Sequence, residues 1–227
     1  MMELHRWDLT YIEAIKLQKE LRQSITIMPA PSNYNLIAGA DVSYDKKNDK
    51  CIASCVIYSI IENKIIEEAI AVKNISFPYI PGLLSFREVP VLLDAFNKVK
   101  NNYEIAILDG QGFAHPRRFG LASHIGLWLG KPTIGCAKTK LIGTYEMPLN
   151  SKGSWSFLYD KNEIIGAVLR TKEKTKPLFI SIGNKMNLQD AISVVLKCIT
   201  KFRIPEPIRA AHNLVNQCKR KMAYAKN

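Results

Sequence analysis

The chain is 227 residues long, enough for one large domain or two small ones, and its 47% hydrophobic and 23% charged residues are ordinary for a globular protein. Lys and Arg outnumber Asp and Glu by 32 to 20, and the resulting net charge of +12 favours a polyanionic partner such as nucleic acid or an anionic membrane surface. No apolar run approaches the roughly 20 residues that a membrane-spanning helix needs, which excludes that class.

The N-terminal stretch and the cysteines indicate the compartment. Residues 1–21 are amphipathic and mixed in charge, which is not typical of a secretory signal. The five cysteines are odd in number and have no paired CxxC spacing, so we interpret them as reduced core thiols and not as disulfides or zinc ligands. We therefore expect a cytoplasmic protein that does not associate with a membrane.

The first half of the sequence predicts a helix followed by an antiparallel meander. Thr10 and Glu13 have the spacing of a capping box, which opens an amphipathic helix that ends near Leu21. Short polar turns then separate three strand-like segments, at residues 36–44, 51–60 and 64–73. A helix over 83–100 follows, with a break expected at Pro90.

The second half begins with an alternation of strand and helix. A short apolar strand at 104–109, a helix at 117–130 and another strand at 132–137 predict a parallel crossover. Three further strands and two helices complete the pattern, at 153–160, 163–171, 177–183, 187–201 and 206–221. We predict one α/β domain over residues 1–227, with a mixed sheet in which the antiparallel meander is continued by parallel strands and flanked by helices.

Two aspartates in this pattern predict a metal site. Asp41 lies within the first strand, and Asp109 ends the first parallel strand. These strands are commonly neighbours in a mixed sheet, and two adjacent buried carboxylates repel unless a cation bridges them. Mg²⁺ suits such oxygen ligands. By spacing alone, Glu88 and His212 are ordinary helical residues and receive no role.

Glycines and basic residues follow Asp109. Gly110 and Gly112 either admit another molecule close to the backbone or simply form a strand-to-helix turn. His115, Arg117 and Arg118 precede a predicted helix N-terminus and together favour a phosphate. Further along the chain, Lys138 and Lys140 either extend this basic patch or form a solvated edge.

Several separated blocks resemble the endonuclease V family, the nucleases that cut near deaminated adenine. They occur in family order over nearly the whole chain, and the second and third are highly specific. The blocks are GADVSY at 39–44, PYIPGLLSFRE at 78–88, LDGQGFAHPRRFGLASHIG at 108–126, PTIGCAKTKLIG at 132–143, KPLFISIGNKMNLQDAI at 176–192 and RIPEPIRAAH at 203–212.

The resemblance implies a ribonuclease H-like fold and a Mg²⁺-dependent phosphodiesterase, with Mn²⁺ as the alternative ion. The expected cut is at the second phosphodiester bond 3′ to deoxyinosine or inosine, leaving 3′-hydroxyl and 5′-phosphate ends, in the repair of deaminated adenine. Asp41, Asp109 and Glu88 would be the acidic metal-binding and catalytic set, with His212 at a position of a metal ligand. Lys138 would be catalytic beside the scissile phosphate.

The resemblance also implies how the base is recognised. An extruded hypoxanthine needs a pocket that reads its edge, and in this family that pocket is largely backbone. Tyr79 would be the wedge that fills the gap left by the base, and His115 would hold a phosphate of the strand. The residues expected around the base are Gly82, Leu84, Gly110 and Gly120.

Two other functions compete with this one. A ribonuclease H-like nuclease without inosine specificity would not need the PYIP wedge, and a basic module that binds nucleic acid without cutting would not need Asp41, Glu88, Asp109 and Lys138 together. The sequence leaves open DNA or RNA as the inosine-containing partner, and one or two metal ions. We expect a monomer, because no heptad pattern or extra apolar helix calls for a second chain.

Overall fold

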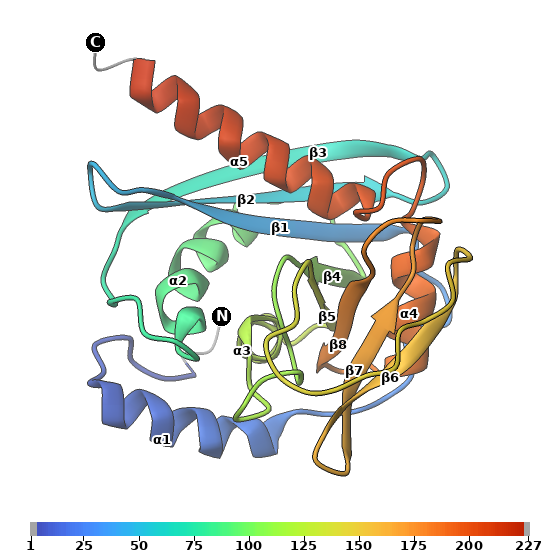
Figure 1. Ribbon diagram of the computed structural model, residues 1–227. Coiled ribbons are helices and arrows are strands. Elements are labelled where there is room, and N and C mark those ends of the chain that lie inside the picture. Colours follow the sequence, from blue (N-terminus) through green and yellow to red (C-terminus); the bar gives the residue numbers. More distant parts are fainter. Residues whose placement is uncertain (1–3, 225–227) are drawn as a thin grey trace.

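An eight-stranded mixed sheet organises residues 4–224, the part of the chain that the computed structural model describes (Figure 1). The strands lie in the order β3-β2-β1-β4-β5-β8-β7-β6. Helices cover both faces of the sheet. The predicted ribonuclease H-like architecture, a meander continued by parallel strands and flanked by helices, is confirmed; the terminal residues 1–3 and 225–227 of the predicted domain lie outside the described residues.

The antiparallel meander forms where the sequence predicts it. Strands β1 (Leu36–Asp45), β2 (Lys50–Ser59) and β3 (Lys64–Asn74) pair antiparallel through short turns. Strand β4 (Ile105–Leu108) then pairs parallel with β1, and β5 (Thr133–Ala137) pairs parallel with β4. The carboxyl ends of β4 and β5 therefore lie next to each other and beside the middle of β1.

Antiparallel strands complete the other side of the sheet. Strand β8 (Leu178–Asn184) pairs with β5, β7 (Glu163–Leu169) pairs with β8, and β6 (Trp155–Asp160) forms the edge. The predicted helices are α1 (Tyr11–Leu21), α2 (Leu84–Phe96), α3 (Leu121–Leu129), α4 (Leu188–Lys197) and α5 (Glu206–Tyr224); a 3-10 turn, η1 (Arg22–Ser24), follows α1.

Two hydrophobic cores hold the helices to the sheet. On one face, α2 and α3 pack on residues that alternate along β1, such as Ala38 and Ala40. On the other face, Ile37 belongs to the core that contains α4 and the first turn of α5. Because successive side chains of a strand point to opposite faces, neighbouring residues of β1 face different helices.

The expected break at Pro90 is wrong, because α2 continues through it. A proline inside a helix removes one backbone hydrogen bond and costs about 3 kcal/mol. In α2 that cost is offset by burial, since most residues of the helix, Pro90 included, lie against the sheet. Burying a large apolar side chain contributes about 1.5–3 kcal/mol, so the tertiary contacts outweigh the lost bond.

The capping box at the start of α1 is confirmed: Thr10 Oγ1 accepts from the Glu13 amide, and the Glu13 carboxylate accepts from the Thr10 amide. Helix α3, by contrast, begins at Leu121 and not at residue 117. Arg118 has φ +57°, a left-handed conformation that a helix does not accommodate.

None of the helices between residues 4 and 224 combines the length and apolar character required to cross a bilayer.

Candidate active site

The register of β1 and β4 places two carboxylates side by side. Ala40 is paired with Leu108, and the Asp109 amide donates to the Ala40 carbonyl at 3.2 Å. Asp41 and Asp109 follow this pair on the two segments, so their side chains lie together where β4 ends beside the middle of β1. The predicted proximity of the two aspartates is confirmed.

Helix α5 approaches the sheet closely at this point. A Cβ on Gly39 would lie 2.3 Å from the backbone of Pro207, so only glycine allows the contact. On the neighbouring strand, Ser54 Oγ donates to the Ala211 carbonyl at 2.7 Å. These two contacts fix the first turns of α5 on β1 and β2 and place the next residue, His212, beside Asp41.

The imidazole of His212 completes a cluster of three groups that could hold a metal ion. Its Nδ1 lies 2.7 Å from Asp41 Oδ2, and its Nε2 lies 3.1 Å from the Asn216 side-chain nitrogen one turn further along α5. One ligand atom from each of Asp41, Asp109 and His212 lies within 4.8 Å of the others. We call these three residues the ligand cluster.

Glu88 approaches the ligand cluster from α2, on the other face of the sheet, and is not one of its three members. It is 7% exposed and accepts a hydrogen bond from Tyr44 Oη at 2.6 Å. Burial, with smaller contributions from Asp41 and Asp109, raises the pKa of Glu88 to about 8, despite the hydrogen bond from Tyr44, which lowers it. Burial and the charge of Asp109 also raise the pKa of Asp41.

Lys138 supplies a positive charge at the same edge. It is the residue after β5, and its Nζ forms an ion pair with Asp109 Oδ2. The side chain of Asp109 is 14% exposed and that of Lys138 is 37% exposed, so the pair is open to solvent on the lysine side. The positively charged ammonium group of Lys138 therefore lies against one carboxylate of the ligand cluster.

A cavity of about 490 Å³ opens next to this cluster, and we call it the glycine-lined pocket. Asp109 and Lys138 contribute to its wall, so the pocket adjoins the ligand cluster. Cavities of this size hold small organic groups. All six residues predicted to bind the substrate line it: Tyr79, Gly82, Leu84, Gly110, His115 and Gly120.

Backbone packing requires glycine at position 120. A Cβ there would lie 2.4 Å from the Gln111 carbonyl oxygen and 2.8 Å from that of Gly112. The Gly120 amide also donates to the Gly112 carbonyl at 2.9 Å. The pocket wall is therefore two stretches of backbone in direct contact.

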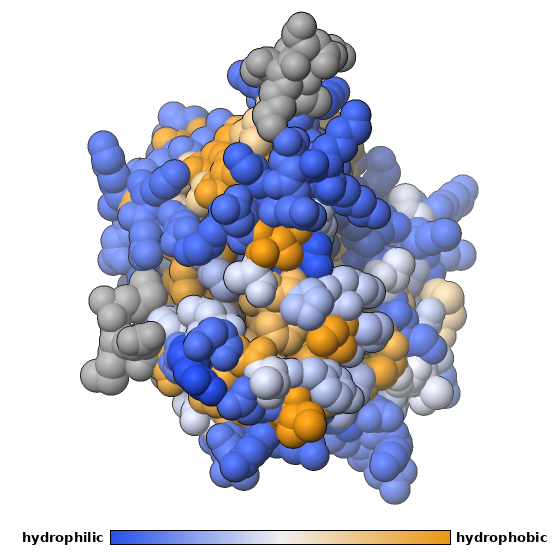
Figure 2. Space-filling model, turned by 90° about the vertical axis from the view of Figure 1, so that its left-hand side faces the viewer, coloured by the Kyte–Doolittle hydropathy of each residue, from blue (hydrophilic) through white to orange (hydrophobic). Residues whose placement is uncertain are grey.

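The surface around the 78–83 loop is apolar. Tyr79 is 69% exposed, and other exposed apolar residues in α1 and at the start of α2 are Tyr11, Ile12 and Leu84. Figure 2 shows the side of the molecule that carries this loop, where apolar and weakly polar residues gather and hydrophilic residues surround them. Such a surface suits contact with an aromatic ring.

The phosphate-binding roles expected after Asp109 need correction. His115 is buried; its Nδ1 accepts from the Arg117 amide at 3.1 Å, and its Nε2 lies 3.1 Å from the Gly82 carbonyl. Burial lowers its pKa to about 4, so the ring is neutral at pH 7. A neutral ring with both nitrogens bonded to protein has none left for a phosphate.

The two arginines of the same motif are also used internally. Arg118 is buried and bonds to Asp160 and Glu163 at 2.7 Å each, joining the loop to β6 and β7. Arg117 donates to the Gly82 carbonyl. The sequence pattern could not show these carboxylates, because they come from strands more than 40 residues away.

A sequence profile of the family described as Endonuclease V matches residues 19–213. The endonuclease V of Dehalococcoides mccartyi is 45% identical over 210 residues, which cover 92% of this chain and 94% of the relative. The chain belongs to the endonuclease V family.

Solved structures of endonuclease V enzymes agree with this assignment. The structure from Streptomyces avermitilis has a TM-score of 0.92 at 38% identity and covers 96% of each chain. That from Ciona intestinalis, in complex with a 24mer DNA containing an inosine followed by a ribo-adenosine, has a TM-score of 0.81 at 30% identity and covers 93% of this chain and 98% of its own.

The donor set in this endonuclease V chain fits a divalent cation. Two carboxylate oxygens and one imidazole nitrogen converge within 4.8 Å, and the raised pKa of Asp41 reflects both burial and the repulsion of Asp109. A bound cation would remove that repulsion. Carboxylate oxygens and an imidazole nitrogen are donors that divalent cations accept.

Among the pocket residues that the sequence pattern did not predict, Gln18 is the one farthest along the chain from the other lining residues. Gln18 lines the glycine-lined pocket from α1 and is 1% exposed. A signal for it existed, because Gln18 follows Ala14 by one helical turn and so lies within the buried stripe of the helix. An uncharged polar side chain in such a stripe needs hydrogen-bond partners inside the protein.

Proposed function

We propose that this endonuclease V hydrolyses the second phosphodiester bond 3′ to inosine or deoxyinosine in nucleic acid, leaving 3′-hydroxyl and 5′-phosphate ends. The observation that carries the proposal is that the glycine-lined pocket and the ligand cluster share Asp109. A base held in the pocket would therefore have its own strand's phosphates close to the carboxylates. Cleavage near the base, and not at it, follows from this arrangement.

Asp41, Asp109 and His212 would hold a divalent cation, Mg²⁺ or alternatively Mn²⁺. Such an ion lowers the pKa of a bound water and polarises a phosphate oxygen. The protein's part is to fix the ligands: Asn216 orients His212, and the close contact of α5 with β1 keeps the imidazole against Asp41.

Glu88 and Lys138 would act on either side of the reacting phosphate. A pKa raised to about 8 makes the ionised carboxylate of Glu88 a stronger base than an exposed carboxylate, and Tyr44 holds one of its oxygens. Glu88 would orient or deprotonate the attacking water or contribute a ligand. Lys138 would offset the charge that develops on the phosphate.

Base recognition would combine a wedge with a backbone-lined wall. The exposed Tyr79 would stack in the gap left by the extruded base, and the backbone of Gly82, Leu84, Gly110 and Gly120 would surround the hypoxanthine. Backbone N–H and C=O groups can read its edge by hydrogen bonds. His115 would support this wall by holding Gly82.

The complex of the Ciona intestinalis enzyme supports inosine-containing DNA as a substrate, and its ribo-adenosine makes RNA a second one to test. The net charge of +12 fits either polyanion. We further propose that the chain acts in the cytoplasm as a monomer. We also propose that it forms one domain, and the single sheet that joins all the described strands supports this part.

Matched single- and double-stranded oligonucleotides, with and without one inosine and in DNA and RNA form, test the proposal. Each is incubated with Mg²⁺, Mn²⁺ or EDTA, with the Asp109→Ala protein alongside. We expect a metal-dependent cut at the second bond 3′ to inosine that the variant lacks. Cutting that ignores inosine would indicate a general nuclease, and binding without cutting a non-catalytic module; either would refute the proposal.

A further inference from the structure

The carbonyl oxygen of Gly82 lies at the centre of a hydrogen-bond network. It accepts from Gln18 Nε2 at 3.1 Å and from Arg117 Nη2 at 2.6 Å, and His115 Nε2 lies 3.1 Å away. Because His115 Nδ1 accepts from a backbone amide, its proton is on Nε2, which makes this the third donor. A carbonyl oxygen has two lone pairs, so three converging donors hold it firmly.

Gln18 joins this carbonyl to the rest of the pocket wall. Its Nε2 also donates to the Phe119 carbonyl at 3.1 Å, and its Oε1 accepts from Arg117 Nε at 2.5 Å. Both amide hydrogens and the amide oxygen are therefore bonded. One buried side chain from α1 thus touches the 78–83 loop, which carries Tyr79, and the 115–120 segment, which precedes α3.

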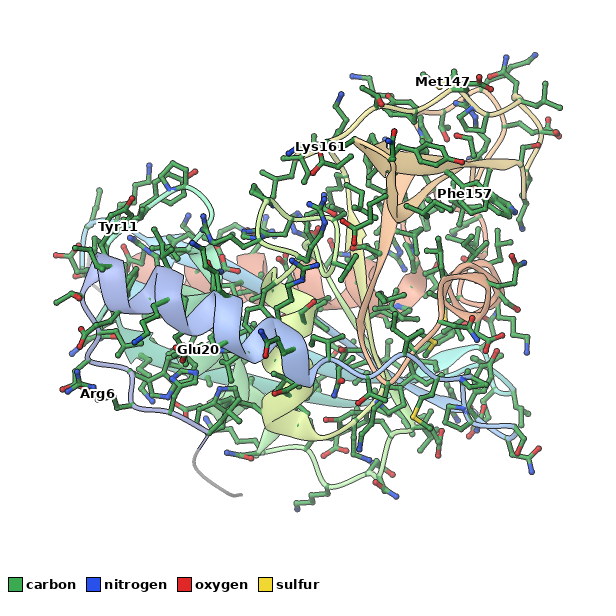
Figure 3. The ribbon with its side chains drawn as sticks, turned by 90° about the horizontal axis from the view of Figure 1, so that it is seen from below. Arg6, Tyr11, Glu20, Met147, Phe157 and Lys161 are labelled. Carbon is green, nitrogen blue, oxygen red and sulfur yellow. The ribbon has the colours of Figure 1, made fainter. Side chains whose placement is uncertain are left out.

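Helix α1 is otherwise a peripheral element. It lies along the underside of the molecule in Figure 1, and Figure 3 looks onto it, with Tyr11 near its start. Its apolar contacts are with the 78–83 loop and α2, in a small core that includes Ala14, Leu83 and Phe86. The helix is placed to support the loop and does not touch the ligand cluster.

We infer that Gln18 is a positioning residue for base recognition: its amide clamps the 78–83 loop onto the 115–120 segment and so keeps the glycine-lined pocket in shape before substrate binds. This inference rests on the proposed function for its substrate, an inosine-containing strand. Gln18 contributes to binding and specificity, while the hydrolytic step depends on the ligand cluster, Glu88 and Lys138.

Three substitutions separate the clamp from mere packing. Gln18→Leu keeps the size but leaves the Phe119 carbonyl and Arg117 Nε without partners. Gln18→Asn keeps the amide but is one methylene too short to reach both segments, and it covers the case in which the leucine variant fails to fold. Glu20→Leu, at an exposed position of the same helix, is the matched control.

Hydrogen exchange of the free protein tests the clamp without any substrate. In Gln18→Leu and Gln18→Asn we expect faster exchange of amides in 78–84 and 115–120, with β1 and β4 unchanged, and no change in Glu20→Leu. Unchanged exchange in both Gln18 variants would overturn the inference. This result stands whether or not the protein cuts inosine-containing nucleic acid, so the two failures are distinguishable.

Steady-state cleavage of an inosine-containing oligonucleotide tests the consequence. Because removing one partner of a buried hydrogen-bond network weakens binding but not the reacting groups, we expect KM to rise about 10-fold with kcat within about twofold. The Glu20→Leu enzyme should match the wild type. A fall in kcat at constant KM, or exchange that increases while KM stays constant, would each overturn the inference.

Discussion

The ligand cluster and the glycine-lined pocket adjoin at Asp109 but are built from different parts of the polypeptide. The cluster consists of side chains that project from β1, the end of β4 and α5. The pocket is walled largely by backbone, where Gly110, Gly120 and Gly82 come together. One region uses ionisable groups, two of which repel each other; the other uses mainly neutral backbone groups.

Because of this difference, the ligand cluster is suited to the hydrolytic reaction and the glycine-lined pocket is suited to recognising the base. Charges held at a fixed distance in a partly buried site can bind a cation and act on a phosphate. Neutral backbone groups in a fixed wall can distinguish one base edge from another. Substitutions in the cluster should therefore change the rate of the reaction, and substitutions in the wall should change stability and binding.

The largest effect is expected from Asp109→Asn, at the residue that the two regions share. The amide keeps the shape but removes the charge that holds the cation, so we expect cleavage to fall at least about 10⁴-fold, while affinity for the oligonucleotide changes little. Single-turnover rates and a binding titration in EDTA measure the two. Loss of binding with equal severity would show that the cluster and the pocket are not separable.

Gly120→Ala should break the pocket wall. Its Cβ would lie 2.4 Å from the Gln111 carbonyl, so the backbone must move, and we expect about 3 kcal/mol lower stability and about 10²-fold lower kcat/KM. Gly153→Ala is the control for backbone strain without a clash, because nothing lies within 4 Å of its Cβ while its φ of +89° disfavours any residue but glycine. Denaturant unfolding and cleavage assays measure both; a Gly120→Ala enzyme with wild-type KM would contradict the close contact.

Protonation of His115, a residue of the pocket wall, makes the stability of the protein depend on pH. Its pKa, about 4 when folded, lies below the 6.5 of the unfolded chain, so its contribution to stability is full above pH 6.5 and is lost as the pH falls toward 4. Between pH 6.5 and 5 we expect this residue to account for about 2 kcal/mol of lost stability. The measurement is the free energy of unfolding at both pH values for wild type and His115→Gln.

The comparison with His115→Gln is needed because other groups titrate in the same window. Glu88, whose pKa is raised to about 8, destabilises the fold as the pH rises and so acts in the opposite sense. Only the difference between the two proteins isolates His115. Parallel pH profiles for wild type and variant would show that the imidazole is not held neutral.

The smallest effect is expected from Tyr44→Phe, which removes the donor 2.6 Å from Glu88 Oε1. Without it Glu88 is held less firmly, and we expect kcat to fall about tenfold with KM unchanged, as for the loss of one buried hydrogen bond. Tyr58→Phe is the matched control, since Tyr58 Oη donates at 2.6 Å to Asn63, away from the cluster. Equal rates for all three proteins would exclude a role for Tyr44.

The sequence by itself determined the order of the elements and the acidic set. Alternating apolar residues and short polar turns define the meander, and an apolar strand that ends on Asp109 beside a strand containing Asp41 indicates a cation site. These features are local, or depend only on the common pairing of the first strand with the first parallel one. The roles of Glu88 and His212 came from the resemblance to the family and not from spacing.

The tertiary structure decided which polar groups remain available for a ligand. Arg118 is an arginine before a helix in the sequence, but Asp160 and Glu163 from distant strands engage it. Pro90 stays inside α2 because burial outweighs the lost hydrogen bond. Gln18 supports the pocket because packing of α1 brings its amide to the Gly82 and Phe119 carbonyls. Contacts between groups far apart in the chain depend on distances that are set by tertiary packing. A local sequence pattern therefore cannot predict them.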